Sequence, residues 1–425
     1  DRRFLSDLAA TWAAEVLVGH GIQVKLVKRS APTPMIMYTV KRDDLSYGMA
    51  ITASHNPAIY NGIKVFIEGG RDADQEATED LERFIAKVGD DDDIPSVDYE
   101  TAKAEGQVEI INPFNDYIDS ILVQIDSEAI RKAGLYVILD PMFGVSRTSL
   151  QTILLTTRCE VDVIHDRHDT LFGGRLPSPN TKTLNALTDV VLESGADIGI
   201  ATDGDADRLG IIDDQGNFLH PNQILVLLYY YLVKYKGWTG PVVRNVATTH
   251  MLDKVAELFG ETCYEVPVGF KHISSKMIET NAVIGGESSG GLTGRGHISG
   301  KDGIYAGSLL VEMIAVVQKP LSEIYKEIVG QFEALYMVEN DFRFADEDKI
   351  RINKLLMEDK KLPVFDEPIE KVSYEDGCKV YFKNGGWIIS RFSGTEPLIR
   401  IFCEMPSEEM AEAYCEQMKA FLLES

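Results

Sequence analysis

The sequence of 425 residues contains only five cysteines, and their spacing suggests no partnership. They are odd in number, widely separated and never in C-x-x-C spacing: Cys159, Cys263, Cys378, Cys403 and Cys415. This pattern argues against a disulfide framework and against a zinc site, and it is typical of reduced thiols. We therefore expect a cytoplasmic protein.

Long hydrophobic runs are also missing. The longest, "ILVLLYYYLV" from Ile224, is about half the length that a membrane-spanning helix needs, so it predicts a buried helix. The first residues, "DRRFLSDLAATWAAEVL", include no initiating Met and do not have the layout of a signal peptide. We expect that the sequence starts after the first structural element and that upstream residues are missing from it.

Positive charge is scarce. Lysine and arginine total 42 against 67 aspartates and glutamates, which gives a net charge of −25. A surface this acidic repels nucleic acids and anionic membranes. Neither is therefore an expected partner, and an anionic ligand would require basic residues concentrated in one pocket.

The length favours about three domains, with two or four also acceptable. The first segment alternates helical periodicity (residues 8–18) with short apolar runs, "IQVKLV" and "YGMAITA", which predicts a largely parallel sheet. Similar βα units begin at "LYVILDPMFGVSR" and near "PVVRNVATTHML". After about Asn340 the pattern changes to strand, turn, strand, loop, strand and a final helix, so an α+β domain is expected there.

The strongest chemical signal is "ATDGDADRLGIID". Asp203, Asp205 and Asp207 occupy alternate positions, so in an extended segment their carboxylates would point the same way. Three like charges are costly together unless a cation joins them, and carboxylate oxygens suit Mg²⁺. An EF-hand fits poorly, because Arg208 and Asp214 stand where that loop has Gly and Glu. An acidic surface turn is the plain alternative.

A second loop, "TASHNP", follows an apolar run and places Ser54 at the strand's end. The adjacent His55 would usually point elsewhere, so a Ser-His-Asp device is not indicated. Lys64, ten residues on, could bind a phosphate or move a proton. A turn serine and a solvated lysine are the structural alternatives.

The third loop, "GGESSGG", contains G-x-S-x-G around Ser288, as in α/β-hydrolases. That fold requires an acid and then a histidine downstream, whereas the only later histidine is His297, with no acid between. The glycines would better allow Glu287 and Ser289 to approach a polyhydroxylated ligand, with a simple glycine turn as the alternative.

The fourth loop, "SRFSGTEPLIR", combines hydroxyls, glycine and arginines. Arg391, Ser393, Gly394 and Thr395 could form a phosphate cradle from side-chain and backbone donors. A surface hairpin loop is the alternative.

In this order, "TASHNP", "DGDADR", "GESSGG" and "RFSGTEP" resemble the four active-site loops of the α-D-phosphohexomutase superfamily, the phosphoglucomutases and phosphomannomutases. The resemblance implies an α/β protein of four domains around a central cleft: three similar α/β units with mixed sheets, and an α+β C-terminal domain. The expected domains are residues 1–115, with the phosphoserine loop; 116–218, with the metal loop; 219–337, with the sugar loop; and 338–425, with the phosphate loop.

The resemblance also implies residue roles. Ser54 matches the phosphoserine, and it would hold Mg²⁺ together with Asp203, Asp205 and Asp207. Lys64 matches a general acid/base, and Arg208 lies beside the metal site with a catalytic role. The residues expected to bind substrate are His55, Arg244, Lys271 in "VGFKHI", Glu287, Ser289, Arg391, Ser393, Gly394 and Thr395.

The implied reaction is reversible phosphoryl transfer between O1 and O6 of a hexose phosphate. It would pass through phospho-Ser54 and a hexose 1,6-bisphosphate that is both intermediate and activator. "GESSGG" and "GFKHI" favour glucose phosphate, with mannose phosphate close behind and glucosamine phosphate less favoured. The expected partners are small sugar phosphates, and the expected protein is a monomer or homodimer.

Two differences from the family pattern are visible. The family's N-terminal G-T-S-G-x-R segment is not in the sequence, and Gly291 stands where some dual-specificity members have His. Two other functions stay open: a Mg²⁺-dependent sugar phosphatase that uses Ser54, and a non-catalytic sugar-phosphate sensor.

Overall fold

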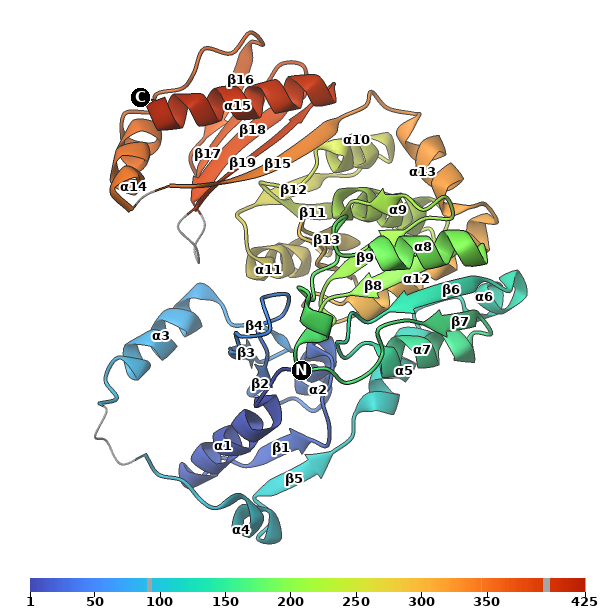
Figure 1. The fold of residues 1–425 in the computed structure, drawn as a ribbon, viewed down its shortest axis with the longest axis vertical. Coiled ribbons are helices and arrows are strands. Elements are labelled where there is room, and N and C mark those ends of the chain that lie inside the picture. Colours follow the sequence, from blue (N-terminus) through green and yellow to red (C-terminus); the bar gives the residue numbers. More distant parts are fainter. Residues whose placement is uncertain (90–93, 345, 393–397, 425) are drawn as a thin grey trace. The chain divides into compact units, whose positions relative to one another are not determined.

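The computed structural model describes residues 1–89, 94–344, 346–392 and 398–424 (Figure 1). The chain divides into two compact units. The first consists of Asp1–Ile224 and Ser289–Ile324, and the second of Leu225–Ser288 and Tyr325–Ser425.

The N-terminal part of the first unit has two small sheets. One is a parallel pair, β1 (Val24–Val27) and β5 (Val108–Ile111). The other is antiparallel: β2 (Tyr47–Ile51), β3 (Ile63–Ile67) and β4 (Arg71–Asp72). The accompanying helices are α1 (Ser6–Gly19), α2 (Thr33–Arg42), α3 (Gln75–Ile85) and α4 (Tyr99–Ala104).

The prediction of a largely parallel sheet in this segment is therefore wrong for β2, β3 and β4. The chain reverses through the short loop of residues 52–62 instead of crossing over through a helix, and a reversal of this kind makes the flanking strands antiparallel. The helix predicted over residues 8–18 is confirmed as part of α1.

The rest of the first unit is built on a mixed sheet with the strand order β10-β9-β8-β6-β7. Three of its strands are parallel to one another: β6 (Tyr136–Asp140), β7 (Glu160–Val163) and β8 (Ile198–Thr202). Two are antiparallel additions: β9 (Leu209–Ile212) and β10 (Phe218–Leu219). The remaining elements of this unit are α5 (Phe114–Leu122), α6 (Ser127–Ala133), α7 (Arg147–Thr156), η1 (Phe172–Gly174), α8 (Asn185–Ser194), β14 (Leu292–Gly294) and α12 (Gly303–Val317).

The central strands β8 and β9 are buried at every position. Helices α8 and α12 both pack against these strands, which explains why the strands read as continuous apolar runs rather than alternating ones. A Cβ placed on Gly307 of α12 would lie only 3.2 Å from Ile200 Cγ2, so the helix approaches the sheet closely. The turn that joins β8 to β9 is therefore flanked by two buried apolar strands.

The apolar run from Ile224 is confirmed as part of a buried helix, α9 (Pro221–Lys234). Among the described residues, no single helix is long and apolar enough to cross a membrane. Only α12 together with α13 (Leu321–Val329) reaches the required length and composition, and an 84° bend separates these two helices.

The second unit contains a parallel sheet with strands β12 (Cys263–Val266), β11 (Val242–Asn245) and β13 (Ile284–Gly286). Helices α10 (Met251–Leu258) and α11 (Phe270–Thr280) accompany it. The C-terminal sheet is antiparallel, in the order β15-β19-β18-β17-β16. In chain order, the elements of this C-terminal part are β15 (Tyr336–Arg343), α14 (Asp346–Asn353), a π-helical turn (Lys354–Glu358), β16 (Ile369–Ser373), β17 (Cys378–Phe382), β18 (Trp387–Phe392), β19 (Leu398–Met405) and α15 (Glu408–Glu424).

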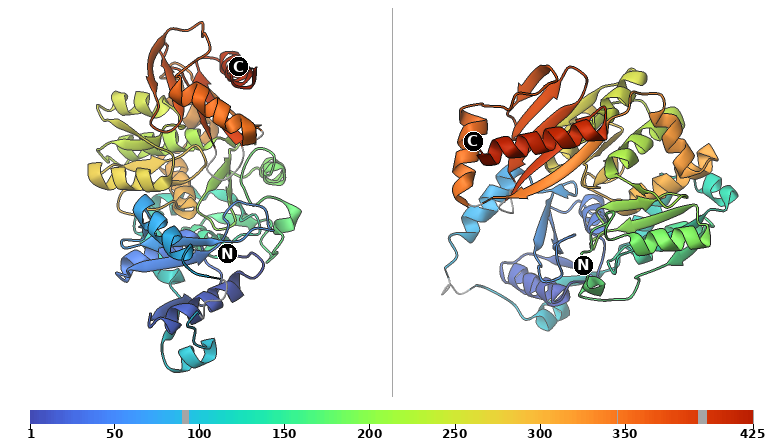
Figure 2. Two further views of the ribbon diagram at one scale, coloured as in Figure 1. Left: turned by 90° about the vertical axis from the view of Figure 1, so that its left-hand side faces the viewer. Right: turned by 45° about the horizontal axis from the view of Figure 1, so that its top comes forward.

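The predicted α+β character of this last segment is confirmed. Three consecutive antiparallel strands, β17, β18 and β19, are followed by α15, which lies along the sheet and packs on β15 and β19 (Figures 1 and 2).

A buried carboxylate ties this sheet to the parallel sheet's first helix. Glu404 of β19 accepts hydrogen bonds from the His250 backbone N–H (2.8 Å), the Thr249 hydroxyl and Trp387 Nε1 (2.8 Å). His250 precedes α10, where a helix N-terminus favours negative charge. Glu404 is 2% exposed, so each of these donors offsets the desolvation of the carboxylate.

We predict that Trp387→Phe destabilises the second unit by about 1–3 kcal/mol, because Glu404 loses a buried donor that water cannot replace. Urea unfolding, followed by hydrogen exchange of peptides from β18 and β19, measures the effect. The control is Trp12→Phe, the same change at a side chain that is 53% exposed. Equal stability of the two variants would contradict the role assigned to Glu404.

Candidate active site

The loop that carries Ser54 is a closed reversal between β2 and β3. The Thr52 backbone N–H donates to Gly62 O (2.9 Å), which joins the two ends of the loop. Ser54 adopts φ = 50°, in the left-handed region that side-chain-bearing residues rarely occupy, and its N–H donates to Thr52 Oγ1 (2.8 Å). Such a conformation persists only where surrounding contacts enforce it.

Ser54 is only 6% exposed, although it lies in a loop at the end of a strand. Its hydroxyl donates to Asp203 Oδ2 at 2.7 Å, so the structure brings the predicted phosphoserine to the predicted metal loop. Gly204 allows this approach, because a Cβ at that position would lie 2.9 Å from the Ser54 carbonyl oxygen.

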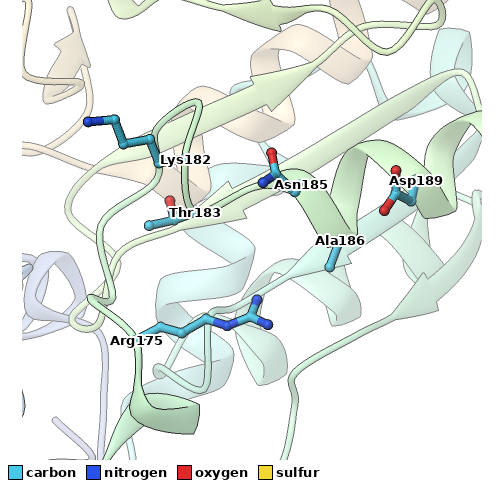
Figure 3. A pocket seen from close by; sticks show the side chains of 6 residues that line it. All are labelled: Arg175, Lys182, Thr183, Asn185, Ala186 and Asp189. Atoms are coloured by element: carbon cyan, nitrogen blue, oxygen red, sulfur yellow. The ribbon is translucent and has the colours of Figure 1, made fainter.

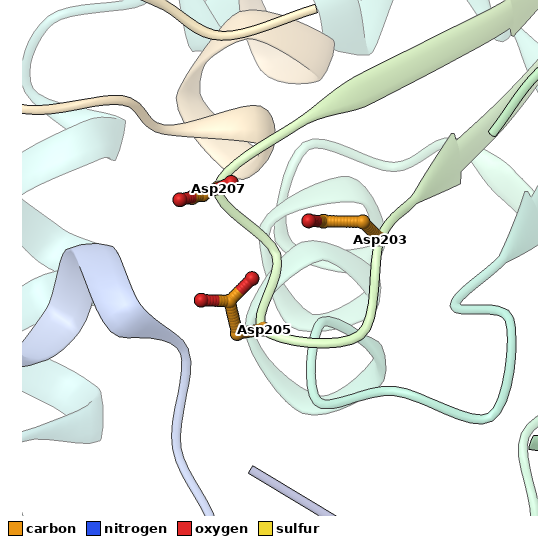
Figure 4. Close-up of side chains that lie close together, drawn as sticks. All are labelled: Asp203, Asp205 and Asp207. Carbon is orange, nitrogen blue, oxygen red and sulfur yellow. The ribbon is translucent and has the colours of Figure 1, made fainter. Parts of the chain in front are cut away.

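The three aspartates lie in the turn between β8 and β9, with ligand atoms all within 4.8 Å of one another (Figure 4). The prediction that they converge is confirmed, but the reason given for it, an extended segment, is wrong. The chain turns here, with Ala206 at φ = 65°, and the turn rather than strand alternation gathers the carboxylates.

Two lysines offset the negative charge of the aspartates, and a threonine donates hydrogen bonds to one of them. Lys64 Nζ donates to Asp205 Oδ2 (2.7 Å) and Asp207 Oδ2 (2.8 Å), and Lys301 Nζ lies 3.0 Å from Asp207 Oδ2. Thr33 donates its hydroxyl to Asp205 Oδ2 (2.7 Å) and its N–H to Asp205 O (2.9 Å). These contacts join residues that are far apart in the sequence.

The carboxyl pKa values diverge as a result. Burial and the neighbouring Asp205 and Asp207 charges raise the pKa of Asp203 well above its usual value. Burial also acts to raise the pKa of Asp207, but Lys301 and Lys64 hold it well below the usual value. Burial acts to lower the pKa of Lys64, yet the charges of Asp205 and Asp207 raise it above the ordinary lysine value.

The cluster fits a divalent cation. Asp205 Oδ1 and Asp207 Oδ1 are buried oxygens with no hydrogen-bond partner among the described residues. Unsatisfied buried carboxylate oxygens are unfavourable, and a hard cation that takes oxygen ligands would satisfy them.

Lys301 and Thr33 were missed by the sequence analysis. Lys301 precedes Asp302, which caps α12 by accepting from the backbone N–H groups of Ile304 and Tyr305 (both 2.9 Å). A Cβ on Gly291 would lie 2.2 Å from Lys301 Cδ, so glycine at that position leaves room for the lysine stem. The signal that could have identified Lys301 is a lysine placed directly before a helix-capping aspartate and a long apolar run.

Three other predicted residues belong to this unit. Arg208 and His55 lie at the aspartate cluster, and Ser289 lies on the surface of the unit. The Arg208 N–H donates to Asp203 Oδ1 (3.0 Å), and its Nε lies 3.9 Å from Asp207 Oδ1. His55 does not point away as expected: its Nδ1 lies 3.4 Å from Ser54 Oγ. Burial and Arg208 lower the pKa of His55 to about 3, so its ring is neutral. Ser289 is exposed.

The second unit gathers another group of predicted residues. Glu287 Oε1 accepts from Asn245 Nδ2 and from the Gly269 N–H, both at 3.2 Å, which places Glu287 against the "VGFKHI" loop that contains Lys271. Arg391 donates to Asp376 Oδ1 (3.1 Å from Nη2), and Asp376 Oδ2 accepts from the N–H of Val268 in the same loop (2.7 Å). The predicted residues Ser393, Gly394 and Thr395 lie outside the described residues.

The guanidinium of Arg244 is buried among carboxylate partners. It is 3% exposed, and it donates to both oxygens of Asp253 (2.8 and 3.1 Å) and to Glu265 Oε2 (2.5 Å). Lys379 adds a second cation to Glu265 Oε2 (2.7 Å). These contacts give Arg244 a structural role inside the second unit.

A pocket of about 480 Å³ lies in the first unit at the start of α8 (Figure 3). None of the predicted site residues lines it. Its lining residues are Arg175, Lys182, Thr183, Asn185, Ala186 and Asp189.

Comparison with known sequence families matches nearly the whole chain to phosphoglucomutase/phosphomannomutase domains. The alpha/beta/alpha domains I, II and III match residues 1–91, 115–216 and 220–332, and the C-terminal domain matches residues 343–421.

Individual relatives agree with this match. A phosphoglucomutase/phosphomannomutase of Thermococcus kodakarensis is 32% identical over 91% of this chain and 80% of its own length. A "probable phosphoglucosamine mutase" of Pyrococcus furiosus is 31% identical over 100% of this chain and 89% of its own. The crystal structure of a candidate phosphomannomutase from Thermus thermophilus has a TM-score of 0.85 and 28% identity, and the match covers 99% of this chain and 88% of that one.

We predict that Asp205→Asn weakens divalent-cation binding at least about tenfold, because the change removes one full charge from the cluster that would hold the ion. Titration calorimetry with Mn²⁺ and with Mg²⁺ measures the affinity. Asp119→Asn, on the exposed side of α5, is the matched control and leaves the affinity unchanged. If Asp205→Asn binds both ions as the unaltered protein does, the cation site is misassigned.

Proposed function

The chain belongs to the phosphoglucomutase/phosphomannomutase family of the α-D-phosphohexomutase superfamily, whose members are isomerases, and we propose that it moves a phosphoryl group reversibly between O1 and O6 of a hexose phosphate. The observation that carries the proposal is the 2.7 Å contact between Ser54 Oγ and Asp203 Oδ2. It sets a hydroxyl nucleophile directly against a carboxylate cluster that fits a divalent cation.

The reaction consists of two transfers. In the first, the bond between phosphorus and Ser54 Oγ breaks while a bond from phosphorus to sugar O6 forms; the O6 hydroxyl gives up a proton and Ser54 Oγ gains one. In the second, the bond between phosphorus and sugar O1 breaks while Ser54 Oγ accepts the phosphoryl group; the Ser54 hydroxyl gives up a proton and O1 gains one. A hexose 1,6-bisphosphate links the two steps, and the same compound activates the dephosphorylated enzyme.

Residues of the first unit take the chemical roles. Asp203, Asp205 and Asp207 would hold Mg²⁺ together with the Ser54 phosphate, and the bound ion would offset charge on the transferring group and orient it. Lys64 is proposed to relay the proton: its ammonium, which lies at the cluster, donates a proton to the oxygen that leaves phosphorus and regains one from the attacking hydroxyl. Arg208 and Lys301 add positive charge beside Asp207.

The substrate-binding roles are proposed as the family resemblance implies them. Glu287 and Ser289 are proposed to bind sugar hydroxyls, and Lys271 and His55 to contact the substrate. The distal phosphate is assigned to Arg391, Ser393, Gly394 and Thr395, where charge-assisted hydrogen bonds would accept either end of the bisphosphate. The 3.1 Å contact between Arg391 and Asp376, next to Val268, supports a link between the phosphate and sugar loops.

Glucose phosphate is the proposed substrate, with mannose phosphate next. Glucosamine phosphate is a third candidate. The Pyrococcus furiosus relative, which aligns with the entire chain, is named a probable phosphoglucosamine mutase. A coupled assay with Mg²⁺ and a trace of glucose 1,6-bisphosphate compares kcat/KM for the three 1-phosphates. Release of inorganic phosphate in place of a 6-phosphate would indicate the phosphatase instead.

We predict that Ser54→Ala reduces turnover below detection while the cation still binds, because the variant loses the oxygen that carries the phosphoryl group but keeps all three aspartates. The coupled assay and Mn²⁺ titration measure the two properties separately. Ser194→Ala, an exposed serine on α8, keeps full activity as the control. Normal turnover by Ser54→Ala would refute the proposed mechanism.

A further inference from the structure

Arg3 donates hydrogen bonds to the backbone of the Ser54 loop, residues 52–62. The residue is 3% exposed, and its two terminal nitrogens donate to four carbonyl oxygens of the loop. Nη2 contacts Ser54 O (2.6 Å) and Asn56 O (2.7 Å), while Nη1 contacts Pro57 O (2.8 Å) and Tyr60 O (3.0 Å). One guanidinium thus binds four carbonyls of the loop, between Ser54 and Tyr60.

The orientation of Arg3 is itself fixed from two sides. Its Nε and backbone N–H donate to the two oxygens of Asp1 (3.1 and 2.9 Å), and Asp1 Oδ2 also accepts from Thr52 Oγ1 (2.8 Å). The guanidinium carbon lies 5.0 Å from the centre of the Phe172 ring, within the range of a cation–π contact. The planar, five-donor fork of arginine suits this set of partners, whereas the ammonium of lysine could serve only some of them.

Phe172, whose ring lies against Arg3, is also close to the turn that carries the three aspartates. Phe172 is buried, and a Cβ on Gly204, between Asp203 and Asp205, would lie 3.4 Å from Phe172 Cε1. Arg3 therefore contacts the backbone of the nucleophile loop on one side and, through Phe172, the turn that carries the aspartates on the other.

The bond to Ser54 O acts on the residue with the unusual backbone conformation itself. Ser54 is held at φ = 50°, and the backbone torsions that orient its carbonyl also restrict the rotamers open to its side chain. Without the Arg3 donors, four carbonyls would lose buried partners, and the loop could relax toward an ordinary conformation that moves Oγ away from Asp203.

We propose that Arg3 is a positioning residue that fixes the Ser54 hydroxyl in line with the carboxylate cluster. The inference rests on the proposed function, because the benefit of this alignment is phosphoryl transfer through Ser54. Displacement of a reacting atom by about 1 Å costs on the order of 100-fold in rate. Arg3 touches no reacting atom, so its removal should lower kcat and leave KM nearly unchanged.

The neighbouring Arg2 offers a matched control. It is also an arginine that donates to backbone carbonyls, Phe143 O (3.3 Å), Asp166 O (3.0 Å) and Arg167 O (3.1 Å), but these belong to loops that do not carry Ser54. Arg2→Lys and Arg3→Lys therefore make the same chemical change one position apart.

The test compares these two variants in the full chain. We expect Arg3→Lys to lower kcat by about 10- to 100-fold with KM within about twofold, and Arg2→Lys to lower kcat no more than about twofold. Hydrogen exchange of peptides covering residues 52–62, measured without substrate, should be faster in Arg3→Lys alone. In Arg3→Ala, added guanidinium at low concentration should restore part of the lost kcat, which a general loss of folding would not allow.

The outcomes separate the two proposals. Normal kcat in Arg3→Lys, or equal losses in both variants, would overturn the role of Arg3 while the mutase function stands. Absence of mutase activity in the unaltered chain would instead remove the proposed function. In that case the exchange experiment still decides about Arg3, because unchanged protection of residues 52–62 in Arg3→Lys would show that Arg3 does not hold the loop.

Discussion

The structure of the first unit depends on keeping three carboxylates together in one buried turn. Mutual repulsion and lost hydration both oppose this arrangement. The chain offsets them with Lys64 from β3, Lys301 from the start of α12, the Thr33 hydroxyl from α2 and the backbone N–H of Arg208. Lys64, Lys301 and Thr33 come from separate segments of the chain, so the charge cluster also joins these segments. The Ser54 hydroxyl donates to the same cluster, at Asp203 Oδ2.

Buried apolar elements support the turn that carries this cluster, although they also add to the cost of removing the carboxylates from water. Strands β8 and β9 are buried throughout, and α12 packs closely against them at Gly307. The second unit places its buried charges differently, since Arg244, Glu265, Lys379 and Glu404 all find partners inside that unit. The charges of the second unit join strands and helices to one another, whereas in the first unit Asp205 Oδ1 and Asp207 Oδ1 have no hydrogen-bond partner in the part of the chain that the structure describes. That contrast is the physical reason for assigning the metal site to the first unit.

Those features of the fold and of the candidate site whose residues are neighbours along the chain could be predicted from the sequence. The aspartates of "DGDADR" converge because one turn holds them, and the C-terminal β17, β18, β19 and α15 follow local apolar patterns. Thr33, Lys301 and Arg3 were missed because their partners are brought near only by the fold. Arg244 was expected to bind substrate; its pairing with Glu265 was not foreseen, because it follows from the strand register and no local signal reveals that register. The antiparallel pairing of β2 and β3 was missed although the reversal between them is local, because its residues were interpreted as an active-site loop and not as a turn between paired strands.

The central claim is that Ser54 is the carrier of the phosphoryl group. The most direct measurement is peptide mass spectrometry of the full chain after incubation with Mg²⁺ and glucose 1,6-bisphosphate, and again after a chase with excess glucose 1-phosphate or glucose 6-phosphate. The account predicts one phosphate on the peptide containing "TASHNP", specifically on Ser54, which the chase removes. A phosphate on another residue, or a Ser54 peptide that is never phosphorylated while turnover proceeds, would contradict the account.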